Sequence, residues 1–227
     1  MARALFSWAL QKCYCKENPF EHIKTKRQDE KKRIIIPPNT RQKIKDYLLE
    51  KNPIFLIILE LVFTSLLRPA EIARIQIKQI HLKEQYIFMP ADKTKNGHNR
   101  HAFCIGLNRG CGRTASEGEV MMIAPLLNNT ADDWYLIGAD FKPGKSPMPV
   151  AKYTKTWDKM RKALHLPDEM QLYSLRDTGI NNMLKSGIDP LTVMQAADHH
   201  DLAMTTRYAN HADPNLIQTL EEHAPKF

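Results

Sequence analysis

The sequence predicts a mainly α-helical domain that carries a small antiparallel β-sheet. Three observations lead to this fold class. Apolar residues recur at helical spacing along most of the chain, proline or N-capping residues mark several helix starts, and two short strand-like runs flank an Asn-Gly pair at 96–97. With 227 residues, of which 43% are hydrophobic, the chain can form one good-sized domain and a fragment of another.

The first 23 residues have the character of a domain remnant. Residues 2–15 repeat apolar positions at helical spacing, and Asn18 before Pro19 ends that helix. We expect segment 1–23 to be the last helix of a helical domain, followed by a basic linker at 24–36. Nine Lys or Arg stand against two acids between Lys24 and Lys45, which indicates either a solvated linker or a surface that binds a polyanion.

Residues 37–227 are expected to form the second domain, and its elements are predicted in chain order. Asn39 or Thr40 is the expected N-cap of its first helix, and Asn52-Pro53 the start of the next. The expected helices are Thr40–Lys51, Pro53 to about Leu66, Pro69 to about Ile77, Glu119–Leu127, Tyr153–Leu164, Thr178–Lys185, Pro190–Ala197 and a piece with Met204–Tyr208. The strands lie in "QYIFMP" and "NRHAFCIGL", joined by a tight type I′ turn at Asn96-Gly97.

Composition and sequence pattern argue against a membrane protein and against a metal-binding protein. No apolar run approaches the roughly 20 residues that span a bilayer, and the N-terminus is a poor signal peptide, so we expect a cytoplasmic protein without a membrane partner. The four cysteines and nine histidines form no metal-binding pattern. We therefore expect neither a metal nor another cofactor.

Polar residues at the ends of the predicted elements form a mixture that suits a phosphodiester substrate. Arginine binds phosphate oxygens bidentately, lysine or histidine can protonate an oxygen leaving group, and a tyrosine hydroxyl can be the nucleophile. Each of these side chains also has an ordinary explanation as a surface or packing residue. The set is Arg68, Glu71, Lys95, Arg176, His199 and Tyr208.

Three segments together resemble the signature boxes of the tyrosine recombinases, the phage-integrase family. They are "TSLLRPAEIARIQIKQI", "LYSLRDTGI" and "ADHHDLAMTTRY", in the family's order and spacing, with a hairpin lysine between the first two. The resemblance covers about residues 36–215, and "LFSWALQKCYCKENPF" resembles the end of the family's helical core-binding domain. It implies the fold of a tyrosine recombinase catalytic domain, which would cleave DNA without metal or ATP.

The resemblance also implies a role for each matching position. Arg68 and Arg176 would clamp the scissile phosphate, and Tyr208 would attack it to form a 3′-phosphotyrosyl link. Lys95 would protonate the 5′-oxygen, with Lys93 as the competing choice. His199 would contact the phosphate or assist proton transfer. The supporting positions are Glu71, Asp198 and His200.

Two positions depart from the family pattern. Tyr173 stands where the family's second box usually has histidine, and a tyrosine can donate a hydrogen bond but is a poor base at neutral pH. Asp198 stands where the third box usually has glycine, which puts a negative charge beside the site. That charge could orient His199 or slow the reaction.

These features predict a site-specific DNA recombinase or integrase of a bacterial prophage or mobile element. The alternatives are a type IB topoisomerase-like enzyme and a catalytically silent DNA-binding regulator. The expected partners are double-stranded DNA and neighbouring protomers, which a C-terminal helix with Leu216, Ile217 and Leu220 would contact. The expected DNA-binding residues are Lys24, Lys26, Arg27, Lys31, Lys32, Arg33, Lys93 and Arg100.

Overall fold

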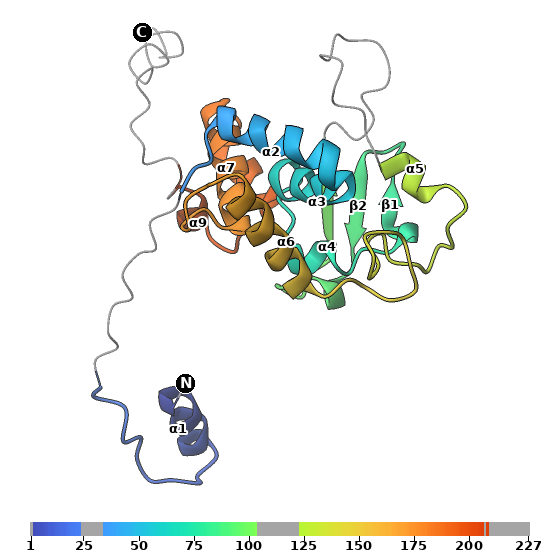
Figure 1. Ribbon diagram of the computed structural model, residues 1–227. Helices are drawn as coiled ribbons and strands as arrows, with labels where there is room; N and C mark the ends of the chain where they lie inside the picture. Colours follow the sequence, from blue (N-terminus) through green and yellow to red (C-terminus); the bar gives the residue numbers. More distant parts are fainter. Residues whose placement is uncertain (1, 24–33, 104–122, 207, 209–227) are drawn as a thin grey trace, which may run out of the picture. The chain divides into compact units, whose positions relative to one another are not determined.

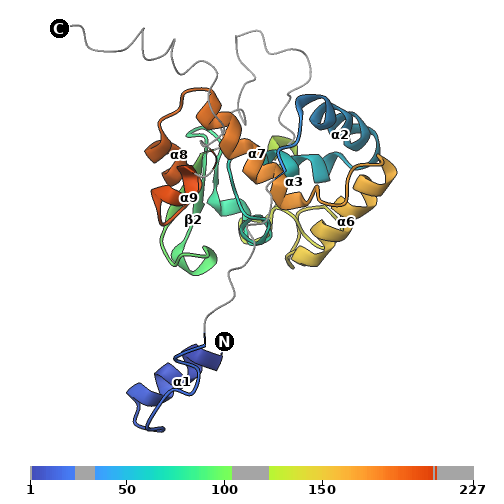
Figure 2. The ribbon, with the colours of Figure 1, turned by 90° about the vertical axis from the view of Figure 1, so that its left-hand side faces the viewer.

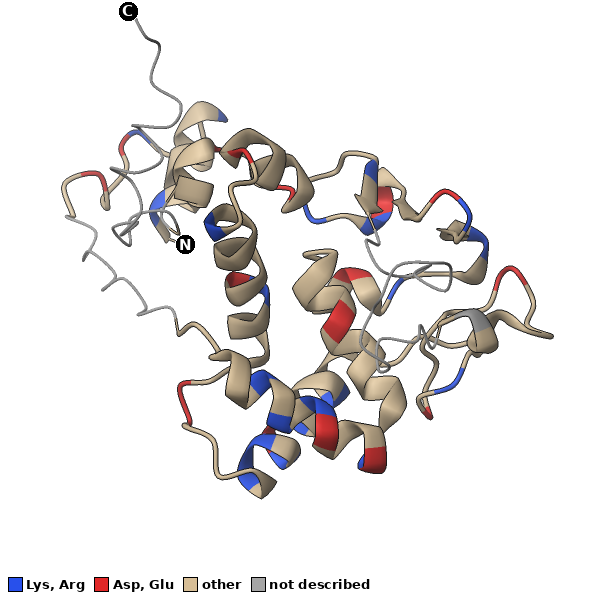
Figure 3. Cartoon of the chain, turned by 90° about the horizontal axis from the view of Figure 1, so that it is seen from above, with Lys and Arg blue, Asp and Glu red and all other residues tan. Residues whose placement is uncertain are grey.

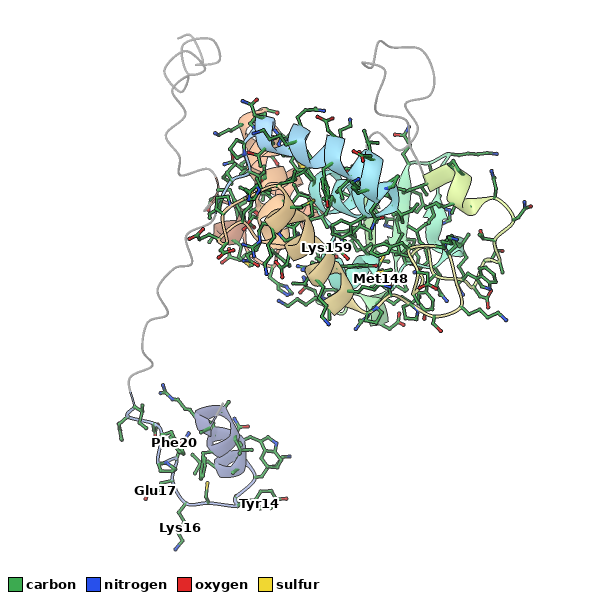
Figure 4. All side chains as sticks on the ribbon, in the orientation of Figure 1. Tyr14, Lys16, Glu17, Phe20, Met148 and Lys159 are labelled. Carbon is green, nitrogen blue, oxygen red and sulfur yellow. The ribbon has the colours of Figure 1, made fainter. Side chains whose placement is uncertain are left out.

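A computed structural model describes residues 2–23, 34–103, 123–206 and 208. The chain divides into two compact units, residues 1–32 and 33–227. The first unit contains α1 (Ala2–Gln11). The Asn18 side chain donates to the Ser7 hydroxyl and the Arg3 carbonyl, and Phe20 packs against Phe6 with ring centroids 5.2 Å apart (Figures 1 and 4). These contacts fold the segment after α1 back onto the helix.

The second unit is mainly helical with a small antiparallel sheet, which confirms the predicted fold class. Its helices are α2 (Pro38–Lys51), α3 (Pro53–Thr64), α4 (Pro69–Ile72), α5 (Ile123–Leu127), α6 (Val150–Ala163), α7 (Leu172–Lys185), α8 (Pro190–Ala196) and α9 (Leu202–Thr206). Two short 3₁₀ segments are η1 (Ile77–Gln79) and η2 (Ala91–Lys93). The strands are β1 (Ile80–His81), β2 (Tyr86–Met89) and β3 (Arg100–Phe103).

Proline and asparagine set the helix starts. Asn52 accepts a hydrogen bond from the Phe55 backbone at 3.1 Å, the capping contact that the sequence predicts. Helix α2 begins at Pro38, earlier than the predicted start after Asn39 or Thr40. Proline suits the first position of a helix, because a backbone N–H there has no partner within the helix and its loss costs nothing. Helix α7 begins at Leu172, six residues before the predicted start.

Helix α4 ends at Ile72, well before the predicted end near Ile77. The next residues are drawn into backbone pairing with residues 134–136. The Ile75 carbonyl accepts from Leu136 N at 2.9 Å, and Ile77 N donates to the Trp134 carbonyl at 2.9 Å. Tertiary pairing therefore overrides the helical pattern in this segment.

The sheet has the order β1-β2-β3, with antiparallel pairing throughout. The predicted hairpin is present, since Met89 pairs with Arg100, but its connection spans residues 90–99. Of the Asn-Gly pair, only Gly97 has a positive φ, at 69°, so the predicted type I′ turn is wrong. The Thr94 hydroxyl closes the wider loop by bonding the Ala91 and His98 carbonyls. Strand β1 lies outside both predicted strands.

Helices α3 and α7 form the centre of the unit, with α2 and α6 on one side and α8, α9 and the sheet on the other (Figure 2). The large core joins α2, α3, the sheet and α6, and it fully buries Tyr153 and Trp157. A smaller apolar cluster lies under the C-terminal helices; it consists of Leu66, Ile180, Val193, Ala197 and Tyr208. Gly179 lets α7 approach the end of α3 closely.

Replacing Gly179 by alanine should reduce stability. An added Cβ would lie 2.2 Å from the Phe63 carbonyl oxygen and 2.9 Å from Leu66 Cδ2. We expect Gly179→Ala to lower the free energy of unfolding by about 2 kcal/mol, although alanine alone favours a helix by about 1 kcal/mol. Urea denaturation measures this, with the exposed Lys185→Ala in the same helix as control. Equal stability of Gly179→Ala and the parent chain would contradict the close packing.

Candidate active site

A buried carboxylate joins two arginines at the start of α4. Glu71, 2% exposed, accepts from Arg68 Nη1 at 2.7 Å through Oε1 and from Arg100 Nη1 at 2.9 Å through Oε2. Glu71 Oε2 also accepts from the Arg68 backbone N–H at 2.9 Å, which fixes the start of the helix. One carboxylate thus holds two guanidinium groups side by side.

Backbone carbonyls at the ends of α3 and α8 hold the arginines from the other side. Arg176 Nε donates to the Leu66 carbonyl at 2.9 Å, and its Nη2 donates to the Ala197 carbonyl. Arg100 Nη2 donates to the Ala196 carbonyl at 2.5 Å and to the Leu66 carbonyl at 3.4 Å. These carbonyls lie at helix C-termini, where the partial charge is negative and favours a cation.

Leu66 and Asp198 both adopt a left-handed backbone, with φ of 52° each. Such a conformation costs a residue other than glycine roughly 1–2 kcal/mol. Each residue ends a helical segment and aims a carbonyl at an arginine, Leu66 at Arg176 and Asp198 at Arg68. The strain is therefore located where the backbone turns toward the site.

Asp198 binds the guanidinium of Arg68 and the hairpin loop at the same time. Its Oδ2 accepts from Arg68 Nη1 and from Asn96 Nδ2, each at 2.8 Å. Its carbonyl accepts from Arg68 Nη2 and Asn96 Nδ2, each at 2.9 Å. Asp198 thus ties Arg68 to the loop that carries Lys95.

The pKa values of the arginines follow their surroundings. Burial lowers the pKa of Arg100 and of Arg176, and for Arg176 the neighbouring Arg68 and Arg100 lower it further. Burial also lowers the pKa of Arg68, but hydrogen bonds and charge interactions with Asp198 and Glu71 outweigh it and raise the pKa above its ordinary value. Arg68 is therefore the best compensated of the three cations.

The hydroxyl of Tyr208 lies against α7. It donates to Asp177 Oδ1 at 2.5 Å, and the Tyr208 side chain is buried in the small apolar cluster. The His199 ring stacks on the Tyr208 ring, with centroids 6.4 Å apart and planes 13° apart. His199 Nδ1 lies 2.9 Å from Thr205 Oγ1. His199, Tyr208 and the helix that carries Arg176 are thereby brought together.

The two remaining predicted catalytic residues, Tyr173 and Lys95, are more exposed than the arginines. Tyr173 is 45% exposed, and the Arg176 guanidinium carbon lies 5.8 Å from its ring centre. Lys95 is exposed and adjacent to Asn96, whereas Lys93 Nζ is held 2.7 Å from Gln76 Oε1. Burial lowers the pKa of Lys93. His200 is exposed beside His199.

Arg100 does not fit its predicted role as a surface DNA contact. It is 6% exposed and bonded to Glu71 and the end of α8, because its position in β3 faces inward. The other basic residues expected to bind DNA, apart from Lys93, lie outside the described residues, as does the predicted C-terminal helix with Leu216, Ile217 and Leu220.

Sequence reasoning missed a basic stripe on α6. Lys155, Lys159 and Lys162 are exposed at i, i+4 and i+7, so they share one face of the helix. Figure 3 marks the charged positions, and Lys159 is labelled in Figure 4. The spacing of these three lysines in the sequence is the signal that could have revealed the stripe. Asp177 and Asn96 were missed as well, because only the fold reveals their partners Tyr208 and Asp198.

No group of three or more His, Cys, Asp or Glu within the described residues could hold a metal ion. Among those same residues, none of the helices combines the length and apolar character that crossing a bilayer takes.

The chain is similar in fold to solved structures of recombinases and integrases. The chain is similar to a lambda integrase dimer bound to a COC′ core site, at 13% identity and a TM-score of 0.66, over 92% of this chain and 57% of that one. It is similar to the Tn1549 transposon integrase in complex with circular intermediate DNA, at 15% identity, TM-score 0.62, over 96% and 75% of the two chains. It is also similar to XerA recombinase, at 16% identity, TM-score 0.62, over 86% and 66%.

At these identities the likeness establishes the fold, and this chain spans only 66% of the XerA chain. A search of curated proteins finds no match. A family model described as the phage integrase family matches residues 25–215, which is most of the chain and contains all three boxes. The chain therefore belongs to the phage integrase family.

Proposed function

We propose that this protein is a tyrosine recombinase that cleaves and rejoins DNA strands through a 3′-phosphotyrosyl intermediate. The observation that carries the proposal is the convergence of Arg68, Arg176, His199 and Tyr208, from separate segments, on the ends of α3 and α8. These side-chain types suit a phosphodiester and its pentacoordinate transition state. The formal charge of +8 favours a polyanionic partner.

Arg68 retains hydrogen-bonding capacity for a phosphate. Within the described part of the chain, Glu71 and Asp198 take both Nη1 hydrogens and the Asp198 carbonyl takes one Nη2 hydrogen. A guanidinium has five N–H groups, so Nε–H and the second Nη2–H can still bind phosphate oxygens. Arg176 donates Nε–H to the Leu66 carbonyl and one Nη2–H to the Ala197 carbonyl, so its Nη1 group and second Nη2–H can bind phosphate oxygens.

In the proposed reaction the Tyr208 oxygen attacks phosphorus, and the bond to the 5′-oxygen breaks. Lys95 gives a proton to that oxygen, while Arg68 and Arg176 stabilise the negative charge of the transition state. The energy of the broken bond is kept in the phosphotyrosyl link, so rejoining by the 5′-hydroxyl needs no ATP. Lys95 is favoured over Lys93, because Lys93 is bonded to Gln76.

The wider setting is proposed on the same basis. The protein would act on double-stranded DNA in the bacterial cytoplasm, in the service of a prophage or mobile element. The basic residues of segment 24–33 and the exposed lysines of α6 would contact phosphates, and the segment after Tyr208 would contact neighbouring protomers. One observation favours a silent DNA-binding regulator as the second candidate: Asp198 already binds Arg68.

Tyr208→Phe tests the nucleophile. The probe is a fluorescent duplex library of random sequence in which each duplex carries a nick, so that cleavage releases a short strand and traps the covalent adduct. The parent chain should form an adduct that survives a denaturing gel, and Tyr208→Phe should form none while binding DNA equally, because only the attacking oxygen is lost. Tyr47→Phe is the matched control. No adduct with the parent chain would favour the silent regulator.

Lys95→Ala tests the proton donor, on a duplex of a sequence recovered from that library. Cleavage should slow by roughly 100-fold or more. A substrate whose 5′-bridging oxygen is replaced by sulfur should restore the rate, because a thiolate leaves without a proton. Lys93→Ala is the matched control and should be insensitive to the sulfur. Equal slowing of Lys95→Ala on both substrates would exclude Lys95 as the acid.

A further inference from the structure

The proposed nucleophile has a defined hydrogen-bond acceptor that the family motif does not assign. The Tyr208 hydroxyl donates to Asp177 Oδ1 at 2.5 Å. The Tyr208 ring is fixed in the small apolar cluster against Leu66 and Ile180, with 5% of its surface exposed. Its carbonyl accepts from Asn181 Nδ2, one turn beyond Asp177 on α7, at 3.2 Å. Both ends of the tyrosine are therefore held by the same helix.

Tyr173 and His199, two other described candidates for the base, are less suited to accept the proton of Tyr208. Tyr173 is exposed beside Arg176, and a tyrosine hydroxyl is a poor base at neutral pH. The His199 ring lies nearly parallel to the Tyr208 ring, and its Nδ1 lies 2.9 Å from the Thr205 hydroxyl. Asp177 is the residue whose carboxylate meets the hydroxyl directly.

We infer that Asp177 is the general base that takes the proton of Tyr208 during cleavage; this rests on the proposed function. As the bond between the Tyr208 oxygen and phosphorus forms, the hydroxyl proton passes to Asp177 Oδ1. The phosphorus bond to the 5′-oxygen breaks, and Lys95 supplies the proton to that oxygen. Cleavage ends with Asp177 protonated and Lys95 neutral, and rejoining reverses both transfers.

An aspartate is a competent base for this step. Protein kinases use an aspartate to accept the proton of a substrate hydroxyl during phosphoryl transfer. Proton transfer in the transition state needs a short hydrogen bond first and a matched pKa second. Asp177 follows Arg176 directly in α7, so the base and one arm of the proposed phosphate clamp share one rigid element. The geometry thus couples activation of the nucleophile to binding of the phosphate.

Asp177→Asn tests the inference by the pH dependence of single-turnover cleavage. Asparagine keeps the shape and can accept the hydrogen bond, but it cannot take the proton. Among the described residues, the titratable His199 ring stacks on Tyr208, and the charged Arg176 precedes Asp177 in α7. A window of pH 7.5–9.5 lies above the ordinary titration of a histidine and below that of a tyrosine. Asp158→Asn on α6 is the control for loss of one charge.

With Asp177 as base, the parent chain and Asp158→Asn should cleave at a rate that changes little across this window. Asp177→Asn should be roughly 100-fold slower at pH 7.5, and its rate should rise about tenfold per pH unit as free tyrosinate increases. Asp177→Glu should recover part of the rate and the flat profile, which excludes a folding defect as the cause.

Three results would overturn the inference. Cleavage by Asp177→Asn at the rate of the parent chain would exclude Asp177 as the base, and faster cleavage would make the contact inhibitory. A slow variant with a flat profile would make Asp177 merely structural. Failure of the parent chain to form any adduct would instead overturn the proposed function, and this inference with it.

Discussion

The requirement to neutralise three buried guanidinium groups governs the organisation of this domain. Arg68, Arg100 and Arg176 are each no more than 9% exposed, and leaving a buried charge without partners costs several kcal/mol. Glu71 supplies a carboxylate to two of them, and the ends of α3 and α8 supply carbonyls. The first two boxes, the hairpin and the C-terminal helices must therefore pack together to satisfy these groups. The site and the fold are stabilised by the same contacts.

Much of the fold could be predicted because local chemistry determines it. Asn52 and the prolines mark helix starts, and strand-like runs on both sides of the Asn-Gly pair predict β2 and β3. The predictions failed where distant segments decide the outcome. Pairing of residues 75–77 with 134–136 shortens α4, and nothing local to Ile75 indicates that partner. The hairpin loop is wide because Thr94 bonds carbonyls on both of its sides, which overrides the Asn-Gly preference for a tight turn.

The candidate site likewise contains residues that the sequence predicts and contacts that it does not. Residue types and spacing were sufficient to select Arg68, Arg176, His199 and Tyr208, which the fold brings to one place. Spacing could not distinguish a basic residue that meets solvent from one that is buried, so Arg100 was assigned to DNA rather than to Glu71. It also could not reveal contacts between residues far apart in the sequence, such as that of Tyr208 with Asp177.

The charge balance at the centre of the site explains why Asp198 is compatible with the proposed phosphate clamp. Three guanidinium groups and the Lys95 ammonium stand against the carboxylates of Glu71, Asp198 and Asp177, which leaves one net positive charge. A phosphodiester also carries one charge, so its binding would complete the balance rather than exceed it. Because Asp198 binds Arg68 and Asn96 through the same two oxygens, any movement of Arg68 toward a phosphate also acts on the loop that carries Lys95. The proposed phosphate binding and the position of the proposed proton donor would thus be mechanically linked.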